Sequence, residues 1–125
     1  MANTQAMCTS FLGELLTATH NFGTAPTRGS SAADTFKAAL YLASATINAS
    51  TTAYTSTGEV TSANYTAGGV TVTNANAPTA TNSSATAGVG YWTPSASIVY
   101  GSVGNPVTFA SFDCVLIYNL SLIHI

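Results

Sequence analysis

Charged side chains are scarce in this sequence. Its 125 residues include two Lys or Arg and four Asp or Glu, so 5% of the chain is charged, against roughly a quarter in ordinary globular domains. So few positive charges cannot neutralise a run of phosphates, and they give no attraction to an anionic membrane surface. The composition therefore predicts a protein with no nucleic-acid partner and no membrane partner.

Long apolar runs and cysteine motifs are missing too. No stretch approaches the ~20 apolar residues of a membrane-spanning helix, and the N-terminal residues lack the basic and apolar regions of a secretory signal. Cys8 and Cys114 lie far apart and match no metal or redox spacing. A disulfide between them is one interpretation. Two free thiols that pack as small hydrophobic side chains are the favoured one.

Signatures of catalysis are also absent from the sequence. There is no Gly-x-Ser-x-Gly elbow, no P-loop and no Gly-rich dinucleotide fingerprint. A lone carboxylate offers no partner for acid–base chemistry, and the four acids stand apart, at Glu14, Asp34, Glu59 and Asp113. His20 is expected in a helix and His124 in the tail, which gives little support to a metal site. We predict no catalytic residue, no cofactor, no metal and no enzymatic activity.

The sequence does contain apolar residues in alternating segments. Hydrophobic residues make up 46% of the chain and the net charge is −2, which lies outside the composition of disordered chains. Residues 34–43 are apolar on both faces of a predicted strand, so both faces are expected to be covered. Gly68 and Gly69 predict a turn before the next strand, and 101–106 predicts another. Further strands are expected at 70–73, 91–100 and 112–119.

These elements together predict a fold class. A helix at about 7–21 is expected because Met7, Phe11 and Leu15 follow the helical period of about 3.6 residues, with Gly23 as a stop signal. Short strands with frequent turns predict a mainly β fold, an antiparallel β-sandwich of immunoglobulin-like or jelly-roll-like type. Residues 1–119 are predicted to form this single domain.

Aromatic residues and one long loop are the remaining features. Tyr54 and Tyr65 are expected at strand ends with their hydroxyls near water, and Trp92, the one tryptophan, is expected to anchor the core. Residues 74–90 are rich in Asn, Ser and Gly and predict a long loop. That loop is either a ligand-binding surface or a mobile connector without a ligand, and the sequence leaves both interpretations open.

The last six residues do not follow the sequence pattern of the rest of the chain. Residues 120–125, Leu-Ser-Leu-Ile-His-Ile, follow a predicted strand without a turn. They match the translation of a transposase adapter used to prepare sequencing libraries. We therefore expect a non-native tail and a domain that is incomplete at its C-terminus, with a genuine final strand as the alternative. A strand at 112–119 without its neighbour would leave an open apolar edge that invites self-pairing.

Several segments carry a resemblance to a family of small proteins encoded by tailed bacteriophages. Residues 1–4, 34–41, 65–70, 92–97 and 112–119 read Met-Ala-Asn-Thr, Asp-Thr-Phe-Lys-Ala-Ala-Leu-Tyr, Tyr-Thr-Ala-Gly-Gly-Val, Trp-Thr-Pro-Ser-Ala-Ser and Phe-Asp-Cys-Val-Leu-Ile-Tyr-Asn. The resemblance covers most of 1–119, and family members continue beyond that point, which implies truncation. It implies a virion structural protein of the capsid surface, neck or tail, assembled in the host bacterial cytoplasm. It carries over no site residues.

Two functions follow as expectations. The first is a non-enzymatic structural component of a phage particle, bound to other virion proteins or to copies of itself through neutral β-rich surfaces. The alternative is a carbohydrate- or cell-surface-binding β-sandwich module with a host-surface glycan as its partner. Exposed Tyr54, Tyr65, Tyr91 or Trp92 in a shallow groove would favour this alternative. An enzyme fragment whose catalytic half is missing is a third, weaker reading.

Overall fold

The computed structural model describes the central and C-terminal strands in detail and the N-terminal segment in part. The described residues are 7–8, 10–11, 15, 20, 22, 34–73, 79–80, 90–91, 93–109 and 111–120. Among them, no helix combines the length and apolar character that crossing a bilayer requires. Trp92, His124 and most of the 74–90 segment lie outside these residues, so the predictions made for them are not addressed.

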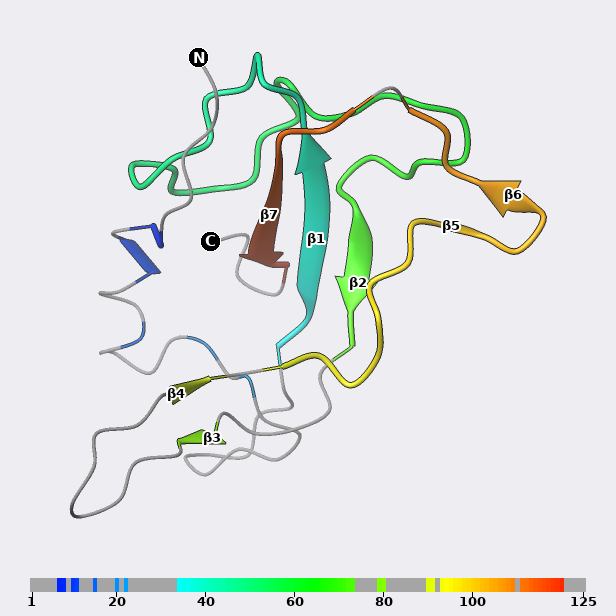
Figure 1. Ribbon diagram of the computed structural model, residues 1–125. Coiled ribbons are helices and arrows are strands. Elements are labelled where there is room, and N and C mark those ends of the chain that lie inside the picture. The colour runs from blue at the N-terminus through cyan, green and yellow to red at the C-terminus, as the bar shows by residue number, and fades with distance from the viewer. Residues whose placement is uncertain are drawn as a thin grey trace.

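A three-stranded antiparallel sheet organises the described part of the chain (Figure 1). Strand β1 (Phe36–Tyr41) lies in the middle, between β2 (Val70–Val72) and β7 (Cys114–Asn119). β1 pairs with β7 along its whole length, from Phe36 opposite Asn119 to Tyr41 opposite Cys114. β2 pairs only with the first half of β1. The alternation in the sequence therefore predicted all three strands. Each strand is shorter in the structure than predicted.

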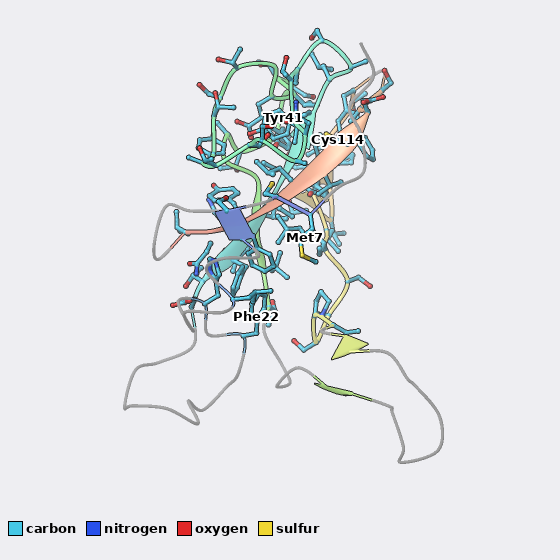
Figure 2. All side chains as sticks on the ribbon, turned by 90° about the vertical axis from the view of Figure 1, so that its left-hand side faces the viewer. Met7, Phe22, Tyr41 and Cys114 are labelled. Carbon is cyan, nitrogen blue, oxygen red and sulfur yellow. The ribbon has the colours of Figure 1, made fainter. Side chains whose placement is uncertain are left out.

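Both faces of β1 are buried, as its two apolar faces predict. On one face Ala39 and Tyr41 pack with Leu116 and Tyr118 of β7, and with Cys8 and Ile47 from outside the sheet. On the other face Phe36, Ala38 and Val72 form a second cluster, covered by Phe22, Ile98 and Tyr100. Figure 2 shows Tyr41 and Cys114 at one end of the sheet and Phe22 at the other. A central strand covered on both sides is thus the core of the described fold.

Two short strand pairs lie outside this sheet (Figure 1). β3 (Thr79–Ala80) pairs with β4 (Gly90–Tyr91), and β5 (Gly101–Ser102) pairs with β6 (Asn105–Pro106). The β5–β6 hairpin confirms the turn expected at 101–106, and Gly101 and Gly104 both have positive φ angles there. The hairpin projects from the β2 side of the sheet.

Among the described residues, the strand expected at 91–100 is present only at Tyr91, which ends β4 (Gly90–Tyr91), and the expectation is wrong for residues 95–100. Residues 95–100 are bends and irregular backbone, with an isolated bridge at Pro94 before them. Ser95 donates its backbone N–H to the Thr73 carbonyl at 2.9 Å, so the segment starts beside the end of β2. Ile98 and Tyr100 then cover the second core cluster. The alternation there reflects packing onto a sheet, and side-chain burial does not require ladder pairing.

The fold class is therefore confirmed at its coarser level. The described residues are mainly strand, in antiparallel sheets, with little helix. Ser10, Phe11 and Leu15 have helical backbone, but the residues between them lie outside the described set. The helix at about 7–21 and the sandwich architecture remain predictions.

The turn before β2 depends on glycine for a steric reason. Gly68 and Gly69 have φ angles of +84° and +73°, where side chains with a Cβ are disfavoured. A Cβ at Gly69 would lie 1.8 Å from the Ala38 carbonyl oxygen, whereas one at Gly104 would meet nothing within 4 Å. The β1–β2 contact thus requires Gly69 itself, in addition to its backbone angle.

We expect Gly69→Ala to lower the free energy of unfolding by roughly 3 kcal/mol or more, because the new methyl group forces β2 away from β1. Gly104→Ala is the matched control, since it shares the positive φ angle without the clash, and should cost about 1 kcal/mol. Urea denaturation of the two variants measures the difference. Equal losses would contradict the steric explanation.

Candidate functional site

Among the described acidic residues, Glu59 is the one that the fold buries. β2 pairs only with the first half of β1. Residues 58–60 lie along the same edge of β1 beyond the end of β2, with a bridge between Tyr41 and Glu59. Leu42 donates its N–H to the Gly58 carbonyl at 2.9 Å, and Val60 donates to the Leu40 carbonyl at 2.9 Å. This short bridge draws Glu59 inward and leaves it 8% exposed.

Three neutral donors converge on the Glu59 carboxylate. The Tyr54 hydroxyl donates to Oε2 at 2.6 Å, and the Tyr65 hydroxyl donates to Oε1 at 2.7 Å. The Gly68 backbone N–H also donates to Oε1, at 2.7 Å. A buried carboxylate needs such donors, because an unpaired one loses its hydration without compensation.

Further tyrosine contacts surround this carboxylate. Tyr118 donates its hydroxyl to the Gly68 carbonyl at 2.9 Å, and its ring stacks on Tyr54 with centroids 4.9 Å apart. Tyr41 donates its hydroxyl to the Thr55 carbonyl. We call Glu59, Tyr41, Tyr54, Tyr65 and Tyr118 the Glu59–tyrosine network. It fastens the 54–68 segment to β1 and β7.

Burial and the nearby carboxylate shift the acidity of these phenols. Burial raises the pKa of Tyr54 to about 12, and the hydrogen bond to Glu59 adds to the effect. Burial also raises the pKa of Tyr100 to about 12. The pKa values of Tyr41, Tyr65 and Tyr118 are raised as well, first by burial and further by the Glu59 charge. These hydroxyls therefore remain neutral donors at physiological pH.

The network corrects one expectation from the sequence. The Tyr54 and Tyr65 hydroxyls were expected near water, but they donate to Glu59. Glu59 stands alone in the sequence, with no local pattern linking it to tyrosines at 41, 54, 65 and 118. Only strand pairing brings them together. The carboxylate already accepts three hydrogen bonds, so the arrangement stabilises the fold rather than presenting a reactive group.

A second polar cluster lies at the other end of β1. The Asn119 side chain is fully buried, and its Nδ2 donates to Asp34 Oδ2 at 2.7 Å and to His20 Nδ1 at 2.9 Å. The His20 ring packs against Phe11, with centroids 4.9 Å apart. Within the described ranges, no three His, Cys, Asp or Glu side chains gather where they could hold a metal ion. His20 thus links an aromatic cluster to the end of β7.

Cys8 and Cys114 are free thiols, as expected, but of the two expected to be buried only Cys8 is, and Cys114 is half-buried. Cys8 is buried and its Sγ lies 3.6 Å from the Asn48 carbonyl oxygen. Burial raises the pKa of the Cys8 thiol, and burial together with the Asp113 charge raises that of Cys114. A raised thiol pKa lowers the fraction of reactive thiolate. Both cysteines act as packing residues.

An open groove lies beside the network, on the β2 side of the sheet. Its volume is about 440 Å³, and Tyr65 and Tyr100 line it with rings inclined by 20° and centroids 6.1 Å apart. We call it the tyrosine groove; its other lining residues are Asn64, Thr66, Val70, Gly101, Ser102 and Asn105. Tyr65 thus belongs to both the network and the groove.

Two hydrogen bonds fix the walls of the tyrosine groove. Asn64 donates its side-chain Nδ2 to the Pro106 carbonyl at 3.2 Å, and Ser62 donates its hydroxyl to the Thr108 carbonyl. They attach the β5–β6 hairpin to the loop before β2. The sequence indicated Tyr65 as a candidate groove residue, but not Tyr100 or Asn105. The local pattern at these residues is a tyrosine followed by a Gly-containing hairpin. This pattern indicates a groove only when the hairpin is known to lie against the loop before β2.

No protein-family model, curated protein or solved structure matches this chain. The class that the fold defines is a mainly β protein with antiparallel sheets.

We expect Glu59→Gln to lower the free energy of unfolding by about 2 kcal/mol or more, because the amide group cannot accept from every donor now satisfied. Tyr54→Phe, which removes one charge-assisted bond, should cost about 1–2 kcal/mol. Asp113→Asn at an exposed position should stay within about 0.5 kcal/mol. Urea titration measures all three, and a neutral Glu59→Gln would disprove the structural role of the carboxylate.

Stability should fall as the pH rises from about 10 to about 12. Tyr54 and Tyr100 ionise near their ordinary pKa of about 10 in the unfolded chain, but only at about 12 when folded. Between these values the unfolded state has lost protons that the folded state keeps, so the free energy of unfolding decreases. Urea midpoints across this pH range test it, with phenolate absorbance as the second readout. Full ionisation of all tyrosines near pH 10 in the folded protein would contradict it.

Proposed function

We propose that this protein is a non-enzymatic structural component of a bacteriophage particle. It joins neighbouring virion proteins, or copies of itself, through the outer edge of β7. The phage assignment rests on the resemblance of the sequence segments to small tailed-phage proteins, with capsid decoration, neck and tail as the candidate positions. The mode of assembly is argued from the sheet.

The observation that carries the assembly proposal is the position of β7 at the edge of the described sheet. β7 ends the three-stranded sheet, and no described strand pairs with its outer side. Val115 and Ile117 on this strand are each 43% exposed. On the same face of the sheet, Ile98 and Tyr100 cover residues of β1 and β2. These two side chains do not extend over β7.

An edge of this kind favours pairing with another strand. An edge strand can pair with another chain through its outer N–H and C=O groups, and proteins that stay monomeric usually protect such edges with charge, proline or a bulge. The β7 sequence, Cys-Val-Leu-Ile-Tyr-Asn, has no charge and no proline. A net charge of −2 adds little repulsion between copies. Exposed Phe112 and Leu120 extend the apolar surface at both ends.

The buried polar groups support a structural role. The Glu59 carboxylate and five of the six tyrosines are engaged in holding the sheet and its loops together. The side chains of Asn119 and Asp34 are hydrogen-bonded to each other at the end of β7. A carbohydrate- or cell-surface-binding module remains the alternative, and the tyrosine groove is the observation that favours it.

We expect the purified protein to self-associate with rising concentration, and Val115→Lys/Ile117→Lys to keep it monomeric. Two lysines on the exposed face of β7 place like charges in the contact. Val99→Lys is the control, because Val99 is exposed but does not belong to the sheet. Sedimentation velocity distinguishes the outcomes. A double variant that associates as strongly as the parent would disprove the β7 contact, and phage particles without this protein's peptides would disprove the virion role.

A further inference from the structure

We propose that the tyrosine groove binds a neutral saccharide through the carbon faces of Tyr65 and Tyr100 and the polar rim around them. This inference does not depend on the assembly proposal, because the groove is lined by Val70 of β2, whereas β7 lies on the opposite edge of the sheet. It names a ligand class for a site distinct from the β7 edge.

Hydrogen bonds to groups inside the protein hold the Tyr65 and Tyr100 side chains in place. The Tyr65 hydroxyl donates to Glu59 Oε1 at 2.7 Å and accepts from the Leu40 N–H at 2.9 Å. The Tyr100 hydroxyl donates to the Ala38 carbonyl at 3.1 Å. Because both hydroxyls are engaged inside the protein, the two rings that line the groove are held in fixed positions. Aromatic rings held in this way contribute contact area at little entropic cost.

The rim of the groove supplies uncharged hydrogen-bonding groups. Ser102 and Asn105 are exposed on the β5–β6 hairpin, and Asn64 and Thr66 face them from the loop before β2. Asn64 uses its Nδ2 to bind the Pro106 carbonyl, which leaves its Oδ1 as an acceptor toward a ligand. Amides and hydroxyls of this kind bind ligand hydroxyl groups as both donors and acceptors.

The chemistry of the groove selects among ligand classes. None of its lining residues is Asp, Glu, Lys, Arg or His, so an anionic or cationic ligand would lose hydration without gaining a counter-charge. A fully apolar ligand would leave the polar rim unsatisfied. A sugar ring offers an apolar C–H face for the tyrosines and a periphery of hydroxyls for the rim. The volume of about 440 Å³ lies in the usual range for small-ligand sites, so a short saccharide fits the groove.

The backbone around the groove is fixed before any ligand arrives. Gly101 has a φ angle of +81°, and a Cβ there would lie 2.7 Å from the Asn105 carbonyl oxygen. Only glycine therefore lets the chain turn between Tyr100 and Ser102, which both line the groove. Asn64 has a φ angle of +65°, a conformation that asparagine tolerates better than most residues. Together with the Asn64–Pro106 bond, these turns preorganise the walls.

The test is a saturation-transfer NMR titration of the whole protein with neutral trisaccharides of glucose, galactose and N-acetylglucosamine, each up to about 10 mM, in the weak-binding range. A trisaccharide of galacturonic acid is the charged comparison. We expect at least one neutral sugar to bind and the acidic one to bind more weakly. Silence of every neutral sugar at this concentration, or preference for the acidic one, overturns the proposal.

Variants then locate the binding. Asn105→Ala and Tyr100→Leu should each weaken the affinity about tenfold, the effect of one good contact. Tyr100→Phe keeps the ring but loses the hydrogen bond to Ala38 that holds it, so its affinity should fall less than that of Tyr100→Leu. Val103→Ala on the same hairpin is the control, since Val103 is exposed and does not line the groove. Unchanged affinity in both Asn105→Ala and Tyr100→Leu would place the sugar elsewhere and overturn the proposal.

Discussion

The described fold depends on one buried carboxylate and the three donors around it. Glu59 is almost fully enclosed, and a charge in that position is tolerated only because Tyr54, Tyr65 and the Gly68 amide donate to it. Each donor belongs to a different part of the 54–68 segment. The carboxylate therefore draws this segment against β1 and fixes the position of the turn that starts β2.

Tyrosine hydroxyls take over a role that ion pairs fill in many other proteins. With 5% charged residues, this chain has few ion pairs available to define the polar contacts of its interior. Tyr41, Tyr100 and Tyr118 donate instead to backbone carbonyls of distant segments. Each such bond satisfies a buried polar group while the ring adds apolar contact area. A neutral surface and a well-specified interior are thus compatible in the same chain.

The two edges of the sheet have different characters. At β7, exposed Val115 and Ile117 lie on the strand that ends the described sheet, and an edge strand suits assembly with another strand. On the β2 side, the tyrosine groove is uncharged, concave and bordered by the β5–β6 hairpin. A subunit held in a larger assembly by the first edge would leave the groove free to meet a ligand. The two proposals are therefore compatible, although each rests on its own residues.

The sequence by itself determined the strands at 34–43, 70–73 and 112–119 and the Gly68–Gly69 turn, because alternation and glycine angles are local properties of the chain. It failed at 95–100, where alternating residues pack on the sheet without joining it. The Glu59–tyrosine network and the tyrosine groove were decided only by the tertiary structure. Their members, from Tyr41 to Tyr118, meet through strand pairing, and a contact between residues so distant in sequence leaves no local pattern.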